Sequence, residues 1–238
     1  MVSFYVDTLP LLEGKEKSGV WKGGPVGIEI REESIYNGWE VYRLNTYVRK
    51  GGMTSMGKVL VFLGSGFEEI EALTVVDVAR RAGIDVEMVS ITGERMVTGS
   101  HHISVAVDLL FEEVDFEEAE MLVLPGGLPG VTNLEAFEPL MQKLDEFHQA
   151  GKLISAICAA PSILGHRGIL KGIRACCYPG YEKDLTDAKV TDGPVEMDGH
   201  IITSRGMGTS MEFALAITEK LMGREKADVI GDKTIFKR

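Results

Sequence analysis

Apolar segments alternate with amphipathic segments from Lys58 onward, and this alternation constrains the fold more than any other feature of the chain. The first apolar segment, residues 59–63, reads Val-Leu-Val-Phe-Leu without a polar interruption. A strand with one face in water alternates apolar and polar residues, whereas a strand covered on both faces is apolar throughout. The sequence therefore predicts a parallel sheet that is covered on both faces.

The boundaries of the other elements follow from hydrophobic spacing and from turn and cap residues. Helical spacing of apolar residues predicts helices over 68–81 and 137–149, which Gly83 and Gly151 end. Short apolar runs predict strands at 85–91 and 121–124, and Asp198-Gly199 predicts a hairpin over 195–202. Helices alternating with strands in this way indicate a doubly wound, mostly parallel α/β sandwich.

The last predicted helix begins with a capping box. Thr209 and Glu212 have the spacing at which the two side chains bond each other's backbone N–H groups. The helix is expected to run from there to about Met222.

The first 55 residues differ from the rest. They contain both tryptophans and a hairpin-like segment, 28–48, with Asn37-Gly38 at its turn. The sequence thus predicts a small β-rich extension, 1–55, before an α/β domain, 56–238. The aromatic side chains of the extension either pack on that domain or bind another molecule, and we expect packing.

Glycines and methionines mark the end of the extension. Gly51-Gly52 forms the predicted linker, and Met53 and Met56 come immediately before the first strand of the α/β domain. Translation starting at one of these methionines is the alternative to a genuine extension.

The charge balance excludes some partners. The chain has 36 acidic and 25 basic residues, a formal net charge of -11, which disfavours binding to nucleic acid or to an anionic membrane. No apolar run reaches the roughly 18 residues of a membrane span, and the N-terminus lacks the pattern of a signal peptide. We therefore expect a cytoplasmic protein with a small-molecule or protein partner.

The cysteine content excludes two other classes of site. Three cysteines without C-x-x-C spacing predict neither a disulfide framework nor a metal or redox pair.

Cys158 lies where a short apolar strand, 153–157, runs directly into a predicted helix. This arrangement is typical of a nucleophile elbow, in which the side chain projects above the sheet and the first N–H groups of the helix favour negative charge. The sequence therefore predicts a thiol whose pKa is lowered toward the thiolate. A small, buried and unreactive cysteine is the alternative.

Three acids follow the first strand, and Glu71 is the best placed of them. It lies one turn into the helix beside Ile70, where burial would raise its pKa so that it stays protonated and donates a hydrogen bond to a thiolate. Glu68 and Glu69 are expected only to complement the helix dipole, and this alternative applies to Glu71 too.

Two further segments follow strands at the same edge of the sheet. Gly126 and Gly127 allow close approach of the backbone, and their N–H groups could hold an oxyanion, although a plain tight turn has the same sequence. Arg205 could anchor a substrate by its charge, or could be an ordinary surface arginine.

These segments together resemble the DJ-1 (ThiJ/PfpI) superfamily, and most closely its DJ-1 branch. The resemblance covers about 57–223 and leaves the first 55 residues unexplained. Five motifs carry it in the family's order: Gly66-Phe67-Glu68-Glu69-Ile70-Glu71, Val76-Asp77-Val78-Ala79-Arg80-Arg81-Ala82-Gly83, Leu124-Pro125-Gly126-Gly127, Ala156-Ile157-Cys158-Ala159-Ala160-Pro161 and Thr203-Ser204-Arg205-Gly206.

The resemblance implies a flavodoxin-like homodimer with an oxidation-prone Cys158 and a protonated Glu71. Gly127 and Ala159 would supply backbone amides at the site. Family members are reported to convert methylglyoxal or glyoxal to hydroxy acids without metal, glutathione or other cofactor, to repair glycated proteins, and to act as redox-regulated chaperones.

Two positions depart from family patterns. The peptidase branch has a histidine directly after its cysteine, where this chain has Ala159, and human-type members have a histidine where this chain has Tyr178. Tyr178 could bond a substrate oxygen but is a poor base near neutral pH.

His101 and His102 are adjacent and cannot readily share a metal, so no metal site is expected there. In the family this stretch lies near the dimer interface, where His101 could reach the partner's site.

Two functions remain open from the sequence. In the leading one, a Cys158 thiolate adds to a 2-oxoaldehyde such as methylglyoxal, Glu71 moves a proton, and lactate is formed. In the other, Cys158 is oxidised and the protein is a redox sensor or chaperone without turnover. An amidase or peptidase would need a histidine base that the sequence does not supply.

Overall fold

A computed structural model describes the backbone of residues 19–23, 26–36, 39–48 and 57–237, and the side chains of 57–237. The chain divides into two compact units, Met1–Thr54 and Ser55–Arg238, which are described separately. The predicted linker, Met53 and Met56 lie outside the described residues, as do the aromatic side chains of the N-terminal extension.

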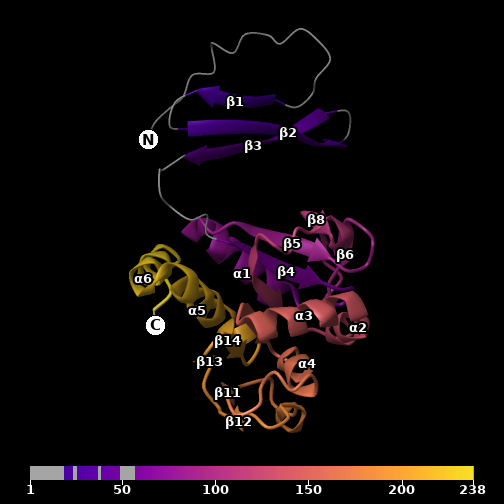
Figure 1. Ribbon diagram of the computed structural model, residues 1–238, viewed down its shortest axis with the longest axis vertical. Helices are drawn as coiled ribbons and strands as arrows, with labels where there is room; N and C mark the ends of the chain where they lie inside the picture. Colours follow the sequence, from indigo (N-terminus) through magenta and orange to yellow (C-terminus); the bar gives the residue numbers. More distant parts are fainter. Residues whose placement is uncertain (1–18, 24–25, 37–38, 49–56, 238) are drawn as a thin grey trace. The chain divides into compact units, whose positions relative to one another are not determined.

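The first unit contains a three-stranded antiparallel sheet in the order β1-β2-β3 (Figure 1). Its strands are β1 (Gly19–Gly23), β2 (Val26–Tyr36) and β3 (Trp39–Val48). The pairing of β2 with β3, which ends at Tyr36 opposite Trp39, confirms the predicted hairpin. The two predicted turn residues, Asn37 and Gly38, lie outside the described residues.

The second unit is built on a seven-stranded sheet in the order β13-β14-β10-β9-β4-β5-β8. All neighbouring strands are parallel except β13 and β14, which form the predicted antiparallel hairpin. The strands are β4 (Lys58–Leu63), β5 (Val86–Ser90), β8 (Leu109–Leu110), β9 (Ala119–Leu124), β10 (Leu153–Ile157), β13 (Val195–Asp198) and β14 (Ile201–Ser204).

Helices cover both faces of this sheet (Figure 1). They are α1 (Glu69–Ala82), α2 (Gly130–Ala136), α3 (Glu138–Ala150), α4 (Pro161–His166), α5 (Ser210–Met222) and α6 (Arg224–Lys233). Strand β4 shows why its sequence is apolar throughout: Val59, Val61 and Leu63 pack with α1, α5 and α6, whereas Leu60 and Phe62 pack on the opposite face with α2, α3 and α4. The predicted doubly wound α/β fold is confirmed.

Shorter elements connect the main ones. They are the hairpin of β6 (Met96–Thr98) and β7 (Ser104–Ala106), the pair β11 (Arg174–Ala175) and β12 (Lys189–Val190), and the 3-10 turns η1 (Phe111–Glu113), η2 (Glu182–Asp184) and η3 (Met207–Thr209). In the described part of the chain, no helix is both long and apolar enough to cross a membrane.

The ends of α1 and α3 agree with the sequence, whereas the start of α5 does not. Gly83 ends α1 in the left-handed conformation, with φ 84°, as its position predicted. The predicted capping box at Thr209 is wrong, because the Thr209 hydroxyl bonds the backbone carbonyl of Gly206 at 2.9 Å instead of capping α5. Glu212 does not complete the box, and its Oε2 atom is buried without a partner among the described residues.

Candidate active site

Three neighbouring strands, β10, β9 and β4, bring the candidate residues together at their carboxyl ends. Cys158 follows β10, Gly126 follows β9, and Glu71 lies in the first turn of the helix after β4. A methyl group built on Gly126 would lie 2.6 Å from Cys158 Cβ and 2.7 Å from Glu71 Oε2. Gly126 therefore lies against both Cys158 and Glu71, and only a residue without a side chain fits there.

Cys158 has the strained backbone of a nucleophile elbow. Its φ angle is 66°, a left-handed value that is uncommon for residues other than glycine. Two later segments hold this conformation: Cys158 N–H donates to the Ser204 carbonyl at 3.0 Å, and the Tyr178 N–H donates to the Cys158 carbonyl at 2.8 Å. The predicted elbow is present, but α4 begins only at Pro161, because residues 158–160 form a separate turn.

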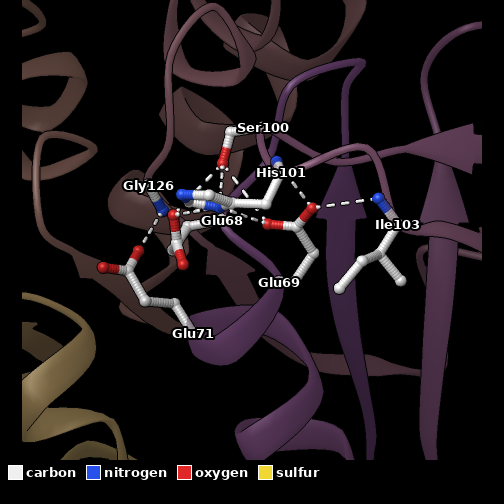
Figure 2. Close-up of polar contacts among 7 residues, drawn as sticks. All are labelled: Glu68, Glu69, Glu71, Ser100, His101, Ile103 and Gly126. Atoms are coloured by element: carbon white, nitrogen blue, oxygen red, sulfur yellow. Dashed lines mark hydrogen bonds and ion pairs between the residues drawn. The ribbon is translucent and has the colours of Figure 1, made fainter.

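Glu71 is completely buried and is held by the backbone of the β9 loop. Its Oε2 atom accepts a hydrogen bond from Gly126 N–H at 2.8 Å (Figure 2). Its Oε1 atom is buried and has no partner among the described residues. The expectation that the Gly126 N–H is free for an oxyanion is therefore wrong, since Glu71 occupies it.

The protonation of Glu71 and Cys158 is coupled. Burial raises the pKa of Glu71 to about 7, against the opposing effect of the Gly126 N–H. Burial, followed by the negative charge of Glu71, raises the pKa of the Cys158 thiol to about 12. The predicted lowering of the thiol pKa is thus wrong for a site with an ionised Glu71. Because the two groups face each other, an ionised Glu71 disfavours the thiolate and a protonated Glu71 favours it.

Two backbone amides oppose the rise in the thiol pKa. The N–H groups of Ala159 and Gly127 both interact with Cys158 and lower its pKa. Gly127 has a φ of 91°, a conformation that glycine adopts without strain. The amides that the family resemblance implied are therefore directed at the sulfur, where they can stabilise negative charge.

Tyr178 lies at the rim of the site, whereas Arg205 is bonded elsewhere. A methyl group built on Gly206 would lie 3.2 Å from the Tyr178 ring and 3.9 Å from Glu71 Oε1, and the Tyr178 side chain is partly exposed. Arg205 Nη1 donates to the Asp192 carbonyl at 3.2 Å. No hydrogen bond described in the structure joins Arg205 to Glu71 or Cys158.

A second polar cluster was missed in the sequence. Glu69 accepts the backbone N–H of His101 at 2.8 Å and lies 3.0 Å from His101 Nδ1, and Ser100 Oγ donates to Glu68 at 3.1 Å (Figure 2). Glu68 and Glu69 thus do more than complement the dipole of α1. One signal in the sequence could have revealed this cluster. Glu68 and Glu69 follow β4, and His101 follows β5 and β6; because β4 and β5 are neighbours in the sheet, the segments after them lie close together.

The raised pKa of Glu71 predicts a specific pH dependence of stability. The folded protein keeps a proton that the unfolded chain loses above about pH 4.3, so this stabilisation is complete below that pH and is lost as the pH rises to about 7. The shift in the pKa of Glu71 corresponds to about 4 kcal/mol. Glu71→Gln cannot lose this proton, so its free energy of unfolding in urea should decline less than that of the wild type over this range.

An exposed glutamate provides the matched control for this measurement. Glu94→Gln removes an acidic residue from the surface and should retain the wild-type decline. If Glu71→Gln shows the same decline as the wild type and Glu94→Gln, the protonation of Glu71 does not differ between the folded and unfolded states.

Comparison with known proteins shows which sequences and folds this chain resembles. The sequence pattern of the DJ-1/PfpI family matches residues 57–220. Protein DJ-1 homolog B of Arabidopsis thaliana is 39% identical over 176 residues, 73% of this chain, but the match spans only 40% of that relative. A deglycase of Pyrococcus abyssi is 34% identical over 154 residues, 63% of this chain and 91% of the deglycase.

A solved structure extends the similarity to the fold. The crystal structure of Drosophila melanogaster DJ-1beta is similar with a TM-score of 0.73 and 35% identity, over 76% of this chain and 99% of that one. The family pattern covers well over half of the chain, and the relatives confirm the resemblance seen in the five motifs. The chain therefore belongs to the DJ-1/PfpI family.

Proposed function

We propose that this protein is a cofactor-independent enzyme of the glyoxalase or deglycase type, which uses Cys158 on 2-oxoaldehydes such as methylglyoxal. The observation that carries the proposal is the pairing of a strained Cys158 with a buried Glu71 whose pKa is raised to about 7. An acid with a pKa near the working pH is suited to proton transfer. Similarity to the Pyrococcus abyssi deglycase supports this class of reaction.

The proposed reaction begins with transfer of the thiol proton to Glu71. The Cys158 sulfur then forms a bond to the aldehyde carbon, and the carbonyl oxygen takes the proton from Glu71 to give a hemithioacetal. The Gly127 and Ala159 amides, which oppose the rise in the thiol pKa, stabilise the charge on sulfur before attack and on oxygen during it. Glu71 is left ionised and can act as a base.

The remaining steps move two protons within the bound substrate and consume one water. Glu71 takes the hydrogen from the former aldehyde carbon and returns it to the neighbouring carbon. The hemithioacetal hydroxyl proton passes to the former ketone oxygen, so that a thioester of lactate results. Water cleaves the thioester, releasing lactate and restoring the thiol. No electrons are gained or lost overall, so the reaction needs neither an oxidant nor a reductant.

Other parts of the proposal concern substrate contacts and assembly. Tyr178, at the rim, would contact the substrate, whereas Arg205, bonded to Asp192, is not assigned an anchoring role. Homodimer formation and a cytoplasmic location belong to the proposal, the first because the family resemblance implies it.

A redox sensor is the second candidate, and the unpartnered Glu71 Oε1 favours it. When protonated, this atom could donate to an oxygen of an oxidised sulfur. Two equivalents of peroxide would each transfer one oxygen to Cys158 and release one water, giving first the sulfenic and then the sulfinic acid.

Lactate formation distinguishes these two functions. The full chain, treated with chelator, is incubated with methylglyoxal without glutathione, and lactate is measured enzymatically against heat-denatured protein. Turnover supports the enzyme. If no lactate forms, and the Cys158 peptide gains two oxygen atoms after peroxide treatment, the protein is a redox sensor and the enzyme proposal is wrong.

A further inference from the structure

Outside the Cys158–Glu71 pair, three metal-ligating side chains meet at the start of α1. Glu68, Glu69 and His101 each offer one ligand atom, and these atoms all lie within 4.8 Å of one another. The glutamates precede and begin α1, while His101 lies in the loop between β6 and β7. The group thus joins two segments about thirty residues apart in the sequence, and it includes none of the residues of the proposed reaction.

The distances within the group suit a tetrahedral cation. His101 Nδ1 lies 3.0 Å from Glu69 Oε2 and 3.5 Å from Glu68 Oε2. Two ligands bound to zinc at about 2.0–2.1 Å in tetrahedral geometry are about 3.3 Å apart. These two edges of a coordination tetrahedron are therefore already present, and an ion would require only small side-chain movements.

The charges of the group also point to a cation. The side chains of Glu68 and Glu69 are only 7% and 5% exposed, whereas that of His101 is 66% exposed. Among the ion pairs that the structure describes, His101 is the one cationic partner of both carboxylates. A single imidazolium can balance one of two buried negative charges, and buried carboxylates without compensation are costly. A divalent cation would balance both.

The surrounding hydrogen bonds hold the ligands in place. Glu69 Oε1 accepts the N–H groups of His101 at 2.8 Å and Ile103 at 3.4 Å, leaving Oε2 directed at the imidazole (Figure 2). Ser100 Oγ lies 3.1 Å from Glu68 Oε2, 3.3 Å from Glu69 Oε2 and 3.0 Å from His101 Nδ1, so its single hydrogen is shared within the group. Such outer contacts orient first ligands in metal sites. The exposed side of His101 leaves access for an ion and for water.

We propose that Glu68, Glu69 and His101 bind a divalent cation of the zinc type, with water in the fourth position. The metal would take the lone pair of His101 Nδ1, so any proton on that nitrogen is released to solvent on binding. The sequence argument against a metal concerned His101 and His102 as joint ligands. The structure separates them, since His102 is exposed, with a φ of 63°, and is not part of the group.

Zinc binding by calorimetry tests the proposal, with the full chain carrying Cys158→Ser so that the thiol cannot bind the metal. One equivalent of zinc should bind. Because His101 and Glu68 would be direct ligands, His101→Gln and Glu68→Gln in this background should each weaken binding at least about 10-fold. His102→Gln, the matched neighbour, should bind as the parent does. Circular dichroism checks that each variant is folded.

Three results would overturn this site. The first is that the folded Cys158→Ser protein binds no zinc. The other two are that His101→Gln and His102→Gln both bind zinc as tightly as the Cys158→Ser parent, or that both weaken binding to the same extent. Cobalt gives an independent measurement: the protein with Cys158 should show visible ligand-field bands that persist in Cys158→Ser. A sulfur-to-cobalt charge-transfer band, with no cobalt bound once Cys158 is replaced, would instead assign the metal to the thiol.

Discussion

Replacing Cys158 by serine should lower the rate of lactate formation from methylglyoxal by at least about 10³-fold, the scale of loss when a covalent nucleophile is removed. A serine hydroxyl is far less readily ionised than a thiol, and Glu71, with a pKa of about 7, is too weak a base to ionise it. Serine is close in size to cysteine, so the buried turn should remain folded. The measurement is kcat/KM for lactate formation, with urea unfolding as the check on stability.

The other two cysteines supply the matched control. Cys176 and Cys177 are also free and buried, but Cys176 bonds Thr203 and Cys177 packs in the core with the α2–α4 layer. Cys177→Ser should lose stability, because it buries a hydroxyl among apolar groups, and should retain kcat/KM within a few-fold of the wild type. Full activity of Cys158→Ser would show that the proposed covalent mechanism is wrong.

Gly127→Ala should lower the free energy of unfolding by about 4 kcal/mol, the sum of a left-handed backbone and a severe clash. Gly127 has a φ of 91°, and a methyl group there would lie 2.4 Å from the Glu68 nitrogen and 2.6 Å from the Gly66 carbonyl oxygen. Both atoms belong to the backbone of the β4–α1 loop, so neither can move aside as a flexible side chain would. Urea unfolding of the variant and the wild type measures the loss.

Gly83 is a control that separates the cost of the left-handed backbone from the cost of the clash. It has a similar φ of 84°, but a methyl group there would meet nothing within 4 Å. Gly83→Ala should therefore lose only the cost of the left-handed conformation, about 1–2 kcal/mol. If Gly127→Ala loses no more than Gly83→Ala, the two loops are not packed as tightly as the structure indicates.

The sequence was sufficient to predict the layers of the fold and the edge of the sheet at which Glu71, Gly127 and Cys158 meet. The apolar run 59–63 indicated a strand covered on both faces, and its side chains do alternate between two helical layers. Glu71, Gly127 and Cys158 were identified because each follows a strand, and the carboxyl ends of parallel strands share one edge of a sheet. These inferences needed only local periodicity and chain order.

What the sequence could not predict depends on which atoms face each other. The turn at Cys158 indicated a favourable place for negative charge, but not that a buried Glu71 would raise the thiol pKa. The sequence also suggested that the Gly126 N–H is free to bind an oxyanion, whereas in the structure it donates to the Glu71 carboxylate. Likewise, Arg205 follows a strand as the site residues do, yet its guanidinium bonds Asp192. Each outcome depends on side-chain direction, which spacing along the chain does not specify.

The two hydrogen bonds that hold the backbone of Cys158 also determine when a ribosome-bound chain can complete the turn at this residue. Their partners are Tyr178 and Ser204, both synthesised after Cys158. A nascent chain that ends before residue 204 already contains Cys158, Glu71 and Gly127, but it lacks the β14 carbonyl that accepts the Cys158 N–H. The strained turn at Cys158 is therefore completed late in translation, after most of the sheet that surrounds it has been synthesised.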